Sequence, residues 1–448
     1  MTDSHHRHTA TTTTHGDACG AVNWHTHADA RGAVNWHEDG SLHFAVGIED
    51  TFVPQSGPGE RPIDEYALTE HYAKWHSDLA LAKDVGAELV RWGVPWYRVQ
   101  PEPGRWDWDW LDRVMGRFAE LGLRPIVDLM HYGTPLWLER QFAHPDYPSL
   151  VAEYSARVAE RYAGYGITDY TPVNEPIIHA QFSGEYAYWP PYLSGPGGLS
   201  SIVSQLARGF VLSQRAMRDV LGERAVFVHV DAGMRYVGDT DAPEHRELVA
   251  RLREQVFLVE DLVTGRVDAS HPLEPFLRAN GWRDEDLAWF AEAAVRPDVV
   301  GVNYYPLHST EVFEAGVFHS GGFPDPRPTR DDGAEGLVEL LRTAADRYGA
   351  PVMLTETCVT DSVKARVDWL DESVAAVRGL RESGVDVVGY TWWPLFDMYE
   401  WTFRHSTRPR EAHRLTMGLW ELRESGEGLA RVRTAVADRF RHHAAGGR

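Results

Sequence analysis

The chain has 448 residues, of which 25% are charged and 43% hydrophobic, a composition typical of globular proteins. Its formal net charge of −22 argues against nucleic acid as a partner, because phosphate backbones are bound by basic surfaces. No apolar run is long enough to span a bilayer, and residues 1–40 lack the apolar stretch of a secretory signal, so we expect a cytoplasmic protein. Cys19 and Cys358 are the only cysteines, and a structural disulfide is not expected.

Residues 1–40 are rich in Thr, His, Ala and Gly and have no helix or strand periodicity, which predicts a disordered tail. The hexapeptide Gly-Ala-Val-Asn-Trp-His occurs there twice, at 20–25 and 32–37. Metal binding by His25, His27 and His37 is one interpretation. A duplicated tail segment is favoured over it, because no metal-ligand spacing on a fixed scaffold is visible.

Residues 41–440 are predicted to form one α/β domain. Short apolar runs alternate there with longer helical stretches, the pattern of a parallel sheet. The predicted strands are 42–48, 88–94, 124–130, 167–174, 225–231, 298–303, 351–356 and 385–393. The predicted helices between them include 64–85, 110–121, 150–163, 199–221, 334–347 and 365–383.

Eight strands, each followed by helical sequence, favour a single closed (β/α)₈ TIM barrel over an open doubly wound sheet. No glycine-rich phosphate motif follows any strand, which also argues against a dinucleotide-binding fold. Residues 321–336 are dense in Gly, Pro and Asp, and they predict a long loop on the barrel face where active sites lie.

Polar residues recur at the C-terminal ends of the predicted strands, which converge on one mouth of a barrel. These residues are His131, Asn174, Glu175, Asn303, Tyr305, Glu356 and Trp393. Glu175 and Glu356 supply the two carboxyls that glycoside hydrolysis needs, one to protonate the leaving oxygen and one to attack. Either glutamate taken alone could instead form a structural ion pair with Arg91. The neighbouring motifs favour a catalytic role over such an ion pair.

From about residue 42 to 422 the chain resembles glycoside hydrolase family 1, the β-glucosidase family, through six motifs in the family's order. Three carry the principal chemistry: Thr171-Pro-Val-Asn-Glu-Pro176, Gly301-Val-Asn-Tyr-Tyr305 and Val352–Thr357. The others are Arg91-Trp-Gly-Val-Pro-Trp96, Met130-His-Tyr-Gly-Thr-Pro135 and Trp393-Pro-Leu-Phe-Asp-Met-Tyr-Glu-Trp401.

The resemblance implies a retaining β-glycosidase with Glu356 as nucleophile and Glu175, its pKa raised, as acid/base. Arg91 would keep Glu356 ionised and Tyr305 would donate to it. The substrate-binding residues implied are His131, Asn174, Asn303, Tyr305, Trp393 as a stacking platform, Glu400 and Trp401. No metal or cofactor is expected, and the partner is a small-molecule glycoside or an oligosaccharide, with homo-oligomerisation left open. Glu400 stands where the branch acting on 6-phosphorylated sugars has a small hydroxyl residue, which favours an unphosphorylated sugar.

The chain departs from the family pattern around the sugar site. The glutamine that follows the family's first strand is displaced by one residue in Gly47-Ile-Glu-Asp-Thr-Phe-Val-Pro-Gln55, so either Gln55 or Glu49 would take its role. Tyr132-Gly133 replaces the usual Trp-Asp, and Thr357-Cys358 replaces Asn-Gly. These changes predict an atypical sugar or aglycone and leave the carboxyl pair intact.

Three alternatives remain beside a hydrolase of this family. The first is a transglycosidase on the same scaffold, which the sequence does not separate from a hydrolase. The second is a non-catalytic, carbohydrate-binding barrel, which predicts loss of a carboxyl that is present here. The third is a hydrolase of a related barrel family, against which the 393–401 segment argues.

Overall fold

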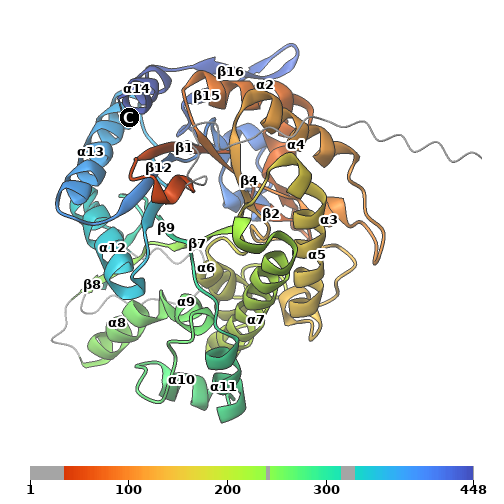
Figure 1. Cartoon of the computed structure of the whole chain (residues 1–448), viewed down its shortest axis with the longest axis vertical. Helices are drawn as coiled ribbons and strands as arrows, with labels where there is room; N and C mark the ends of the chain where they lie inside the picture. Colours follow the sequence, from red (N-terminus) through yellow and green to blue (C-terminus); the bar gives the residue numbers. More distant parts are fainter. Residues whose placement is uncertain (1–34, 239–242, 314–327, 447–448) are drawn as a thin grey trace, which may run out of the picture.

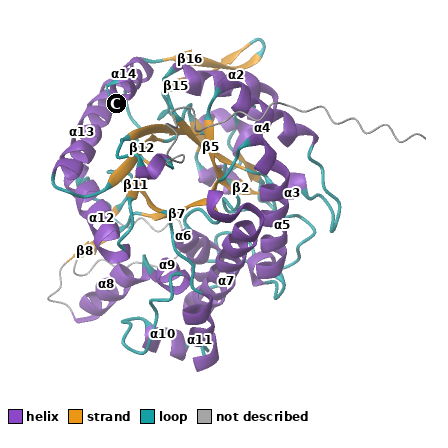
Figure 2. Ribbon diagram, in the orientation of Figure 1, coloured by secondary structure: helices purple, strands orange, loops and turns teal. Residues whose placement is uncertain are grey.

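The computed structural model describes residues 35–238, 243–313 and 328–446, and its centre is a ring of strands enclosed by helices (Figures 1 and 2). The ring is a closed barrel with the strand order β1-β12-β11-β9-β7-β6-β5-β4. Its strands are β1 (His43–Gly47), β4 (Leu89–Gly93), β5 (Arg124–Asp128), β6 (Asp169–Thr171), β7 (Val226–Ala232), β9 (Val299–Asn303), β11 (Val352–Glu356) and β12 (Val387–Trp392). Every neighbouring pair is parallel. The prediction of a (β/α)₈ barrel is therefore confirmed. Each predicted strand coincides with one barrel strand, and only β7 extends past its predicted range, by one residue.

The outer layer consists mainly of long amphipathic helices. They are α2 (His71–Asp84), α4 (Asp109–Leu121), α5 (Tyr147–Tyr162), α7 (Gly195–Leu221), α12 (Gly333–Tyr348), α13 (Val363–Glu382) and α14 (Ala435–Ala445). In α4 the buried side chains are Leu111, Val114, Met115, Phe118 and Ala119, the spacing that places one face of a helix on the barrel.

The single helix predicted over 64–85 is interrupted. The structure has α1 (Glu65–Leu68), capped by the Asp64 side chain, followed by α2. Glu70 separates them with a left-handed backbone, φ 62°, and its carboxylate accepts the backbone N–H of Leu429 at 2.8 Å. Local periodicity did not predict this interruption of the helix, because it involves a contact with a residue remote in sequence.

Shorter helices and strands are inserted around the barrel. The short helices are α3 (Trp96–Val99), α6 (Pro176–Ala180), α8 (Pro243–Gln255), α9 (Leu258–Val263), α10 (Glu274–Ala279) and α11 (Asp284–Ala293). The two-stranded sheets pair β2 (Phe52–Val53) with β3 (Ile63–Asp64), β8 (Arg235–Gly238) with β10 (Thr310–Phe313), β13 (Met398–Tyr399) with β14 (Arg414–Leu415), and β15 (Trp420–Ser425) with β16 (Gly428–Arg433). The predicted loop 321–336 lies partly outside the described residues, and its last four residues belong to α12.

The N-terminal boundary predicted for the domain is corrected by residues 35–40, which were assigned to the tail. Trp36–Glu38 form a 3₁₀ turn in which Trp36 is 6% exposed. Trp36 packs into the cluster of barrel side chains formed by Ala45, Leu89, Ile126, Val228, Val230, Val299, Met353 and Val388. Burial of this indole orders the segment. Of the histidines considered as metal ligands, His25 and His27 lie outside the described residues, and His37 is buried.

Candidate active site

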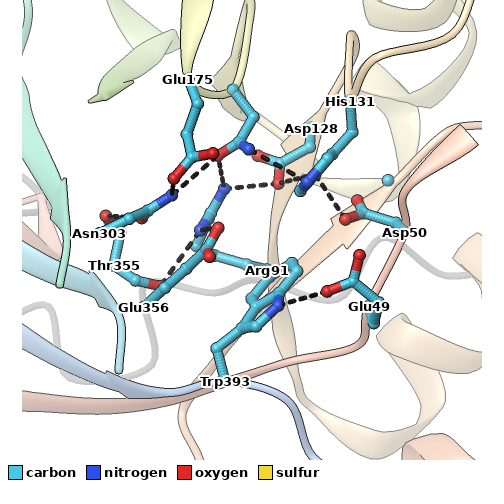
Figure 3. A network of polar contacts seen from close by, with 12 residues as sticks. Glu49, Asp50, Arg91, Asp128, His131, Glu175, Asn303, Thr355, Glu356 and Trp393 are labelled. Atoms are coloured by element: carbon cyan, nitrogen blue, oxygen red, sulfur yellow. Dashed lines mark hydrogen bonds and ion pairs between the residues drawn. The ribbon is translucent and has the colours of Figure 1, made fainter. Parts of the chain in front are cut away.

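The carboxyl ends of the barrel strands surround a cavity of about 740 Å³. Glu356 ends β11, Asn303 ends β9, and His131 and Glu175 lie three and four residues beyond β5 and β6. Figure 3 shows these side chains converging from different strands on one network. The closure of the barrel brings together residues that are far apart in the sequence.

Glu356 is 4% exposed and is held at both carboxylate oxygens. Arg91 Nη1 donates to its Oε1 at 2.7 Å, and Tyr305 Oη donates to its Oε2 at 2.6 Å. Burial raises the pKa of Glu356 to about 8; Arg91 acts in the opposite direction, and the charge of Glu175 adds to the increase. Arg91 therefore favours the ionised carboxylate, as expected, but does not outweigh burial in this state of the site.

Glu175 lies where β6 turns into α6, with a left-handed backbone at φ 44°. Asn303 Nδ2 donates to its Oε1 at 2.9 Å, and Tyr132 Oη donates to its Oε2. Burial, with the charges of Glu175 and Glu356, raises the pKa of Tyr132 well above its ordinary value, so that the phenol keeps its proton and remains a donor. Tyr132 itself has φ 75°, so both partners of this contact have left-handed backbones.

Arg91 is fully buried and joins the two halves of the site. Besides Glu356, its guanidinium contacts Asp128 Oδ2 at 2.7 Å and Asn174 Oδ1 at 2.8 Å. Although burial alone would raise the pKa of Asp128, Arg91 and His131 bring it below its ordinary value. Two carboxylates therefore share one guanidinium. Asp128 still compensates the positive charge of Arg91 when Glu356 changes charge.

His131 is fixed by contacts at both ring nitrogens. Asn174 Oδ1 accepts from Arg91, and its Nδ2 lies 3.0 Å from His131 Nε2. On the other side of the ring, Nδ1 lies 2.6 Å from Asp50 Oδ1, and against the effect of burial the charge of Asp50 raises the pKa of His131 well above its ordinary value. Burial raises the pKa of Asp50 to about 7, against the effect of His131.

Asp50, Asp128 and His131 are the one set of described residues whose ligand atoms are close enough to hold a metal ion, all within 4.8 Å of one another. Asp128 already pairs with Arg91, and His131 Nδ1 already forms an ion pair with Asp50 at 2.6 Å. A divalent cation would have to break both ion pairs and lie next to a guanidinium. The contacts therefore form an ion-pair network that orients His131.

Most of the side chains predicted to be catalytic or substrate-binding border the cavity, and three do not. Those at the cavity are His131, Glu175, Asn303, Tyr305, Glu356, Glu400 and Trp401. Asn174 is fully buried beneath the cavity, in the hydrogen-bond network around Arg91. Trp393 is 1% exposed, with Arg91 4.8 Å above its ring and His131 stacked at 5.7 Å. The sequence predicts that Asn174 and Trp393 both contact the sugar directly. In this structure other side chains contact the polar groups of Asn174 and the ring face of Trp393.

Gln55 is the third, and its assignment as a substrate-binding residue is not supported by its position. Its Nε2 donates to the Thr134 carbonyl and hydroxyl, both at 2.9 Å, and to the Pro135 carbonyl at 3.1 Å. Its amide is thus engaged outside the cavity. Glu49, the other residue considered for this role, borders the cavity and accepts the Trp393 indole N–H at 2.7 Å.

The sequence patterns predict no role for Asp50, Asp128 or the Tyr132 hydroxyl. Asp50 and Asp128 both lie near the ends of predicted strands, so the criterion that identified Glu175 and Glu356 would also have selected them. The contact of Tyr132 with Glu175 has no such signal, because it depends on the left-handed backbone of both residues. Cys358, 2% exposed, also borders the cavity.

Comparison with known proteins agrees with this geometry. A bifunctional β-D-glucosidase/β-D-fucosidase of Bifidobacterium breve is 29% identical over 395 residues, covering 76% of this chain and 82% of that protein. β-Glucosidase A of Thermotoga maritima is 23% identical, covering 76% of this chain and 80% of its own. A family model described as β-galactosidase, of glycoside hydrolase family 42, matches residues 68–165.

Among solved structures, the family 1 β-glucosidase from Thermotoga maritima superposes with a TM-score of 0.74 at 18% identity, covering 91% of this chain and 98% of its own. The same enzyme in complex with glucoimidazole gives 0.75 at 19% identity, with the same coverage. The resemblance to glycoside hydrolase family 1 that the six motifs indicate is thereby confirmed.

None of the helices within the described ranges is both long and apolar enough to cross a membrane.

Proposed function

This chain is a glycoside hydrolase related to the family 1 β-glucosidases, and on that premise we propose that it is a retaining β-glycosidase with Glu356 as nucleophile and Glu175 as acid/base. The observation that carries the proposal is the unequal support of two carboxyls at one cavity. Glu356 receives a guanidinium and a phenol, whereas Glu175 receives an amide and a different phenol. Two carboxyls with different surroundings are what the two roles require.

In the first step Glu356 attacks the anomeric carbon while Glu175 transfers its proton to the departing oxygen, which leaves as an alcohol. A glycosyl ester with Glu356 forms, and Glu175 is then ionised. In the second step Glu175 takes a proton from water as the water attacks the anomeric carbon and Glu356 departs. Arg91 and Tyr305 stabilise Glu356 when it is a free carboxylate, at the start and at the end.

The remaining residues divide into those that contact the substrate and those that position them. We assign Asn303, Tyr305, His131, Glu400 and Trp401 to contact, because they border the cavity. Arg91, Asn174 and Trp393 position their neighbours from below. We propose that the catalytic domain predicted as residues 41–440 also includes residues 35–40, which fold onto it, and the end of α14, which continues to Ala445. The cytoplasmic location remains a proposal from the sequence.

The substrate class follows from the cavity and from the relatives. β-Glucosides and β-fucosides are the substrates named for the Bifidobacterium relative, and an unphosphorylated β-glycoside of this kind is proposed here. Apolar side chains line much of the remaining wall: Ile178, Phe182, Met234, Leu307, Val359, Leu415 and Met417. A wall of this kind suits an apolar aglycone or acceptor. Analysis of products formed with an added alcohol would distinguish hydrolysis from transglycosylation.

Labelling with an aryl 2-deoxy-2-fluoro-β-glycoside tests the central assignment. The fluorine slows the second step, so the glycosyl-enzyme should accumulate, and peptide mass mapping should find the sugar on Glu356. Glu356→Gln is the matched control and should remain unlabelled under the same conditions. A label on any other residue would overturn the assignment of the nucleophile.

A further inference from the structure

The cavity that contains the catalytic pair is lined by an excess of acidic side chains. Of the described residues that border it, five are glutamates and none is Lys or Arg: the glutamates are Glu49, Glu175, Glu311, Glu356 and Glu400. The bordering histidines are His131 and His308. Against the effect of burial, the charge of Asp50 raises the pKa of His131 well above its ordinary value, so this imidazole is paired with Asp50, whereas burial lowers the pKa of His308 and favours its neutral form. Hydrolysis accounts for only two of these carboxyls, so the others bear on which substrate is bound.

Glu49 is the most enclosed of the carboxyls that the reaction does not use, with 3% of its surface exposed. Its Oε1 accepts from the Thr51 backbone N–H at 3.1 Å and from the Thr51 hydroxyl at 2.5 Å. Its Oε2 accepts from the Trp393 indole at 2.7 Å. All three donors are neutral, and within the described part of the chain Glu49 forms no ion pair. A buried carboxylate without a cation is costly, unless a ligand supplies the cation.

The position of Glu49 relates it to a particular part of the sugar. In Figure 3 it lies beside Trp393 and near Asp50, on the side of the network away from Glu175. Glu175 and Glu356 must flank the bond that is cleaved, so a ring seated between them presents carbons remote from the anomeric centre to Glu49. Its neighbour His131 is stacked on the same Trp393 ring. A group at the 3- or 4-position of the sugar is therefore the one within reach.

A carboxylate at this place selects by charge. It accepts hydrogen bonds and donates none, so it pairs best with an ammonium group, less strongly with a hydroxyl, and is repelled by phosphate or a second carboxylate. We propose that Glu49 makes this enzyme selective for β-glycosides whose terminal sugar carries a protonated amino group at position 3 or 4. The inference rests on the proposed glycosidase function and names the substrate class of that site.

The test compares matched aryl β-glycosides that differ at one position: the glucoside, its 3-amino-3-deoxy analogue and its 4-amino-4-deoxy analogue. Since hydrogen bonds to charged groups contribute ~1.5–3 kcal/mol, kcat/KM of the wild-type enzyme should be about 10- to 100-fold higher for one amine than for the glucoside. This preference should disappear in Glu49→Gln and decline as the pH rises through the pKa of the substrate amine.

Glu311→Gln is the matched control, because it removes another carboxylate from the same cavity and should leave the preference intact. Equal loss in both variants, or a wild-type enzyme that prefers the glucoside to both amines, would overturn the proposal. If Glu49→Gln does not fold, the wild-type ratio and its pH dependence still decide. Failure of any 2-fluoro glycoside, amino or neutral, to label Glu356 would instead refute the proposed function, and this inference with it.

Discussion

The Nδ1 atom of His131 lies 2.6 Å from Oδ1 of Asp50, and this buried ion pair holds the imidazole at the edge of the cavity. Asp50 is fully buried, and neither of its carboxylate oxygens accepts a hydrogen bond of regular geometry among the described atoms. The Asp50 carboxylate therefore has His131 as its nearest cationic or donor group. The orientation of His131 at the cavity therefore depends on Asp50, which the substrate does not touch.

Replacing Asp50 by Asn should weaken catalysis through His131. The amide keeps the shape but removes the charge that holds the Nδ1 proton, so kcat/KM for an aryl β-glucoside should fall about 10- to 100-fold. We expect His131 to contact the 3-hydroxyl of the sugar, so the corresponding 3-deoxy glucoside should lose much less. Steady-state kinetics with both substrates would check this, and an equal loss for both would contradict a role acting through His131.

Tyr132→Phe removes the phenol that donates to Glu175. The phenol holds one oxygen of the Glu175 carboxyl in place, so its loss should lower kcat/KM for an aryl β-glucoside about 10-fold, the equivalent of ~1.4 kcal/mol. Steady-state kinetics would measure this loss. Tyr147→Phe is a suitable control, because the buried Tyr147 hydroxyl has no partner among the described atoms. An unchanged kcat/KM in Tyr132→Phe would show that the contact does not position the acid.

Glu356→Gln should increase stability in alkaline solution. The pKa of Glu356 is about 8 in the folded protein and 4.5 ordinarily, so between these values the folded state holds a proton that unfolding releases. Stability conferred by this group is thus complete below pH 4.5 and is lost as the pH rises through 8. The variant cannot lose a proton here, and Arg91 retains Asp128 as its partner.

Urea unfolding at several pH values would check this prediction. The free energy of unfolding should decline less steeply in Glu356→Gln than in the wild type between pH 5 and pH 8, values chosen to lie between the two pKa values of about 4.5 and 8. Glu120→Gln, on a side chain that is 65% exposed, should follow the wild type. Parallel curves for the wild type and Glu356→Gln would rule out a raised pKa at Glu356.

Gly47→Ala should disturb the floor of the site. A Cβ at Gly47 would lie 1.7 Å from the ring of Trp393, so the indole must move, and overpacking of this kind costs about 1–3 kcal/mol. Both the free energy of unfolding and kcat/KM should fall. Gly116→Ala in α4 meets nothing within 4 Å and should be neutral or stabilise by about 0.5–1 kcal/mol. Equal stability and activity in the two variants would mean that Gly47 is not needed for this packing.

Much of the fold was predictable because its signals are local. Alternating apolar strands and helices gave the barrel, and a charged residue at the end of a buried strand marked Glu356 without any knowledge of its partners. Trp36 shows the limit of such signals. Its segment reads as tail, and only the barrel interior that receives the indole explains why it is ordered.

Local sequence patterns specify the barrel and the pair of carboxyls, because strand periodicity and strand ends are properties of neighbouring residues. Packing of the folded chain sets what surrounds that pair: Glu49 lies at the cavity and Gln55 does not, Asp50 pairs with His131, and Tyr132 donates to Glu175. The last of these contacts joins residues 43 positions apart, across two left-handed backbone conformations. Side-chain direction at such positions follows from packing of the whole barrel, which no local pattern encodes.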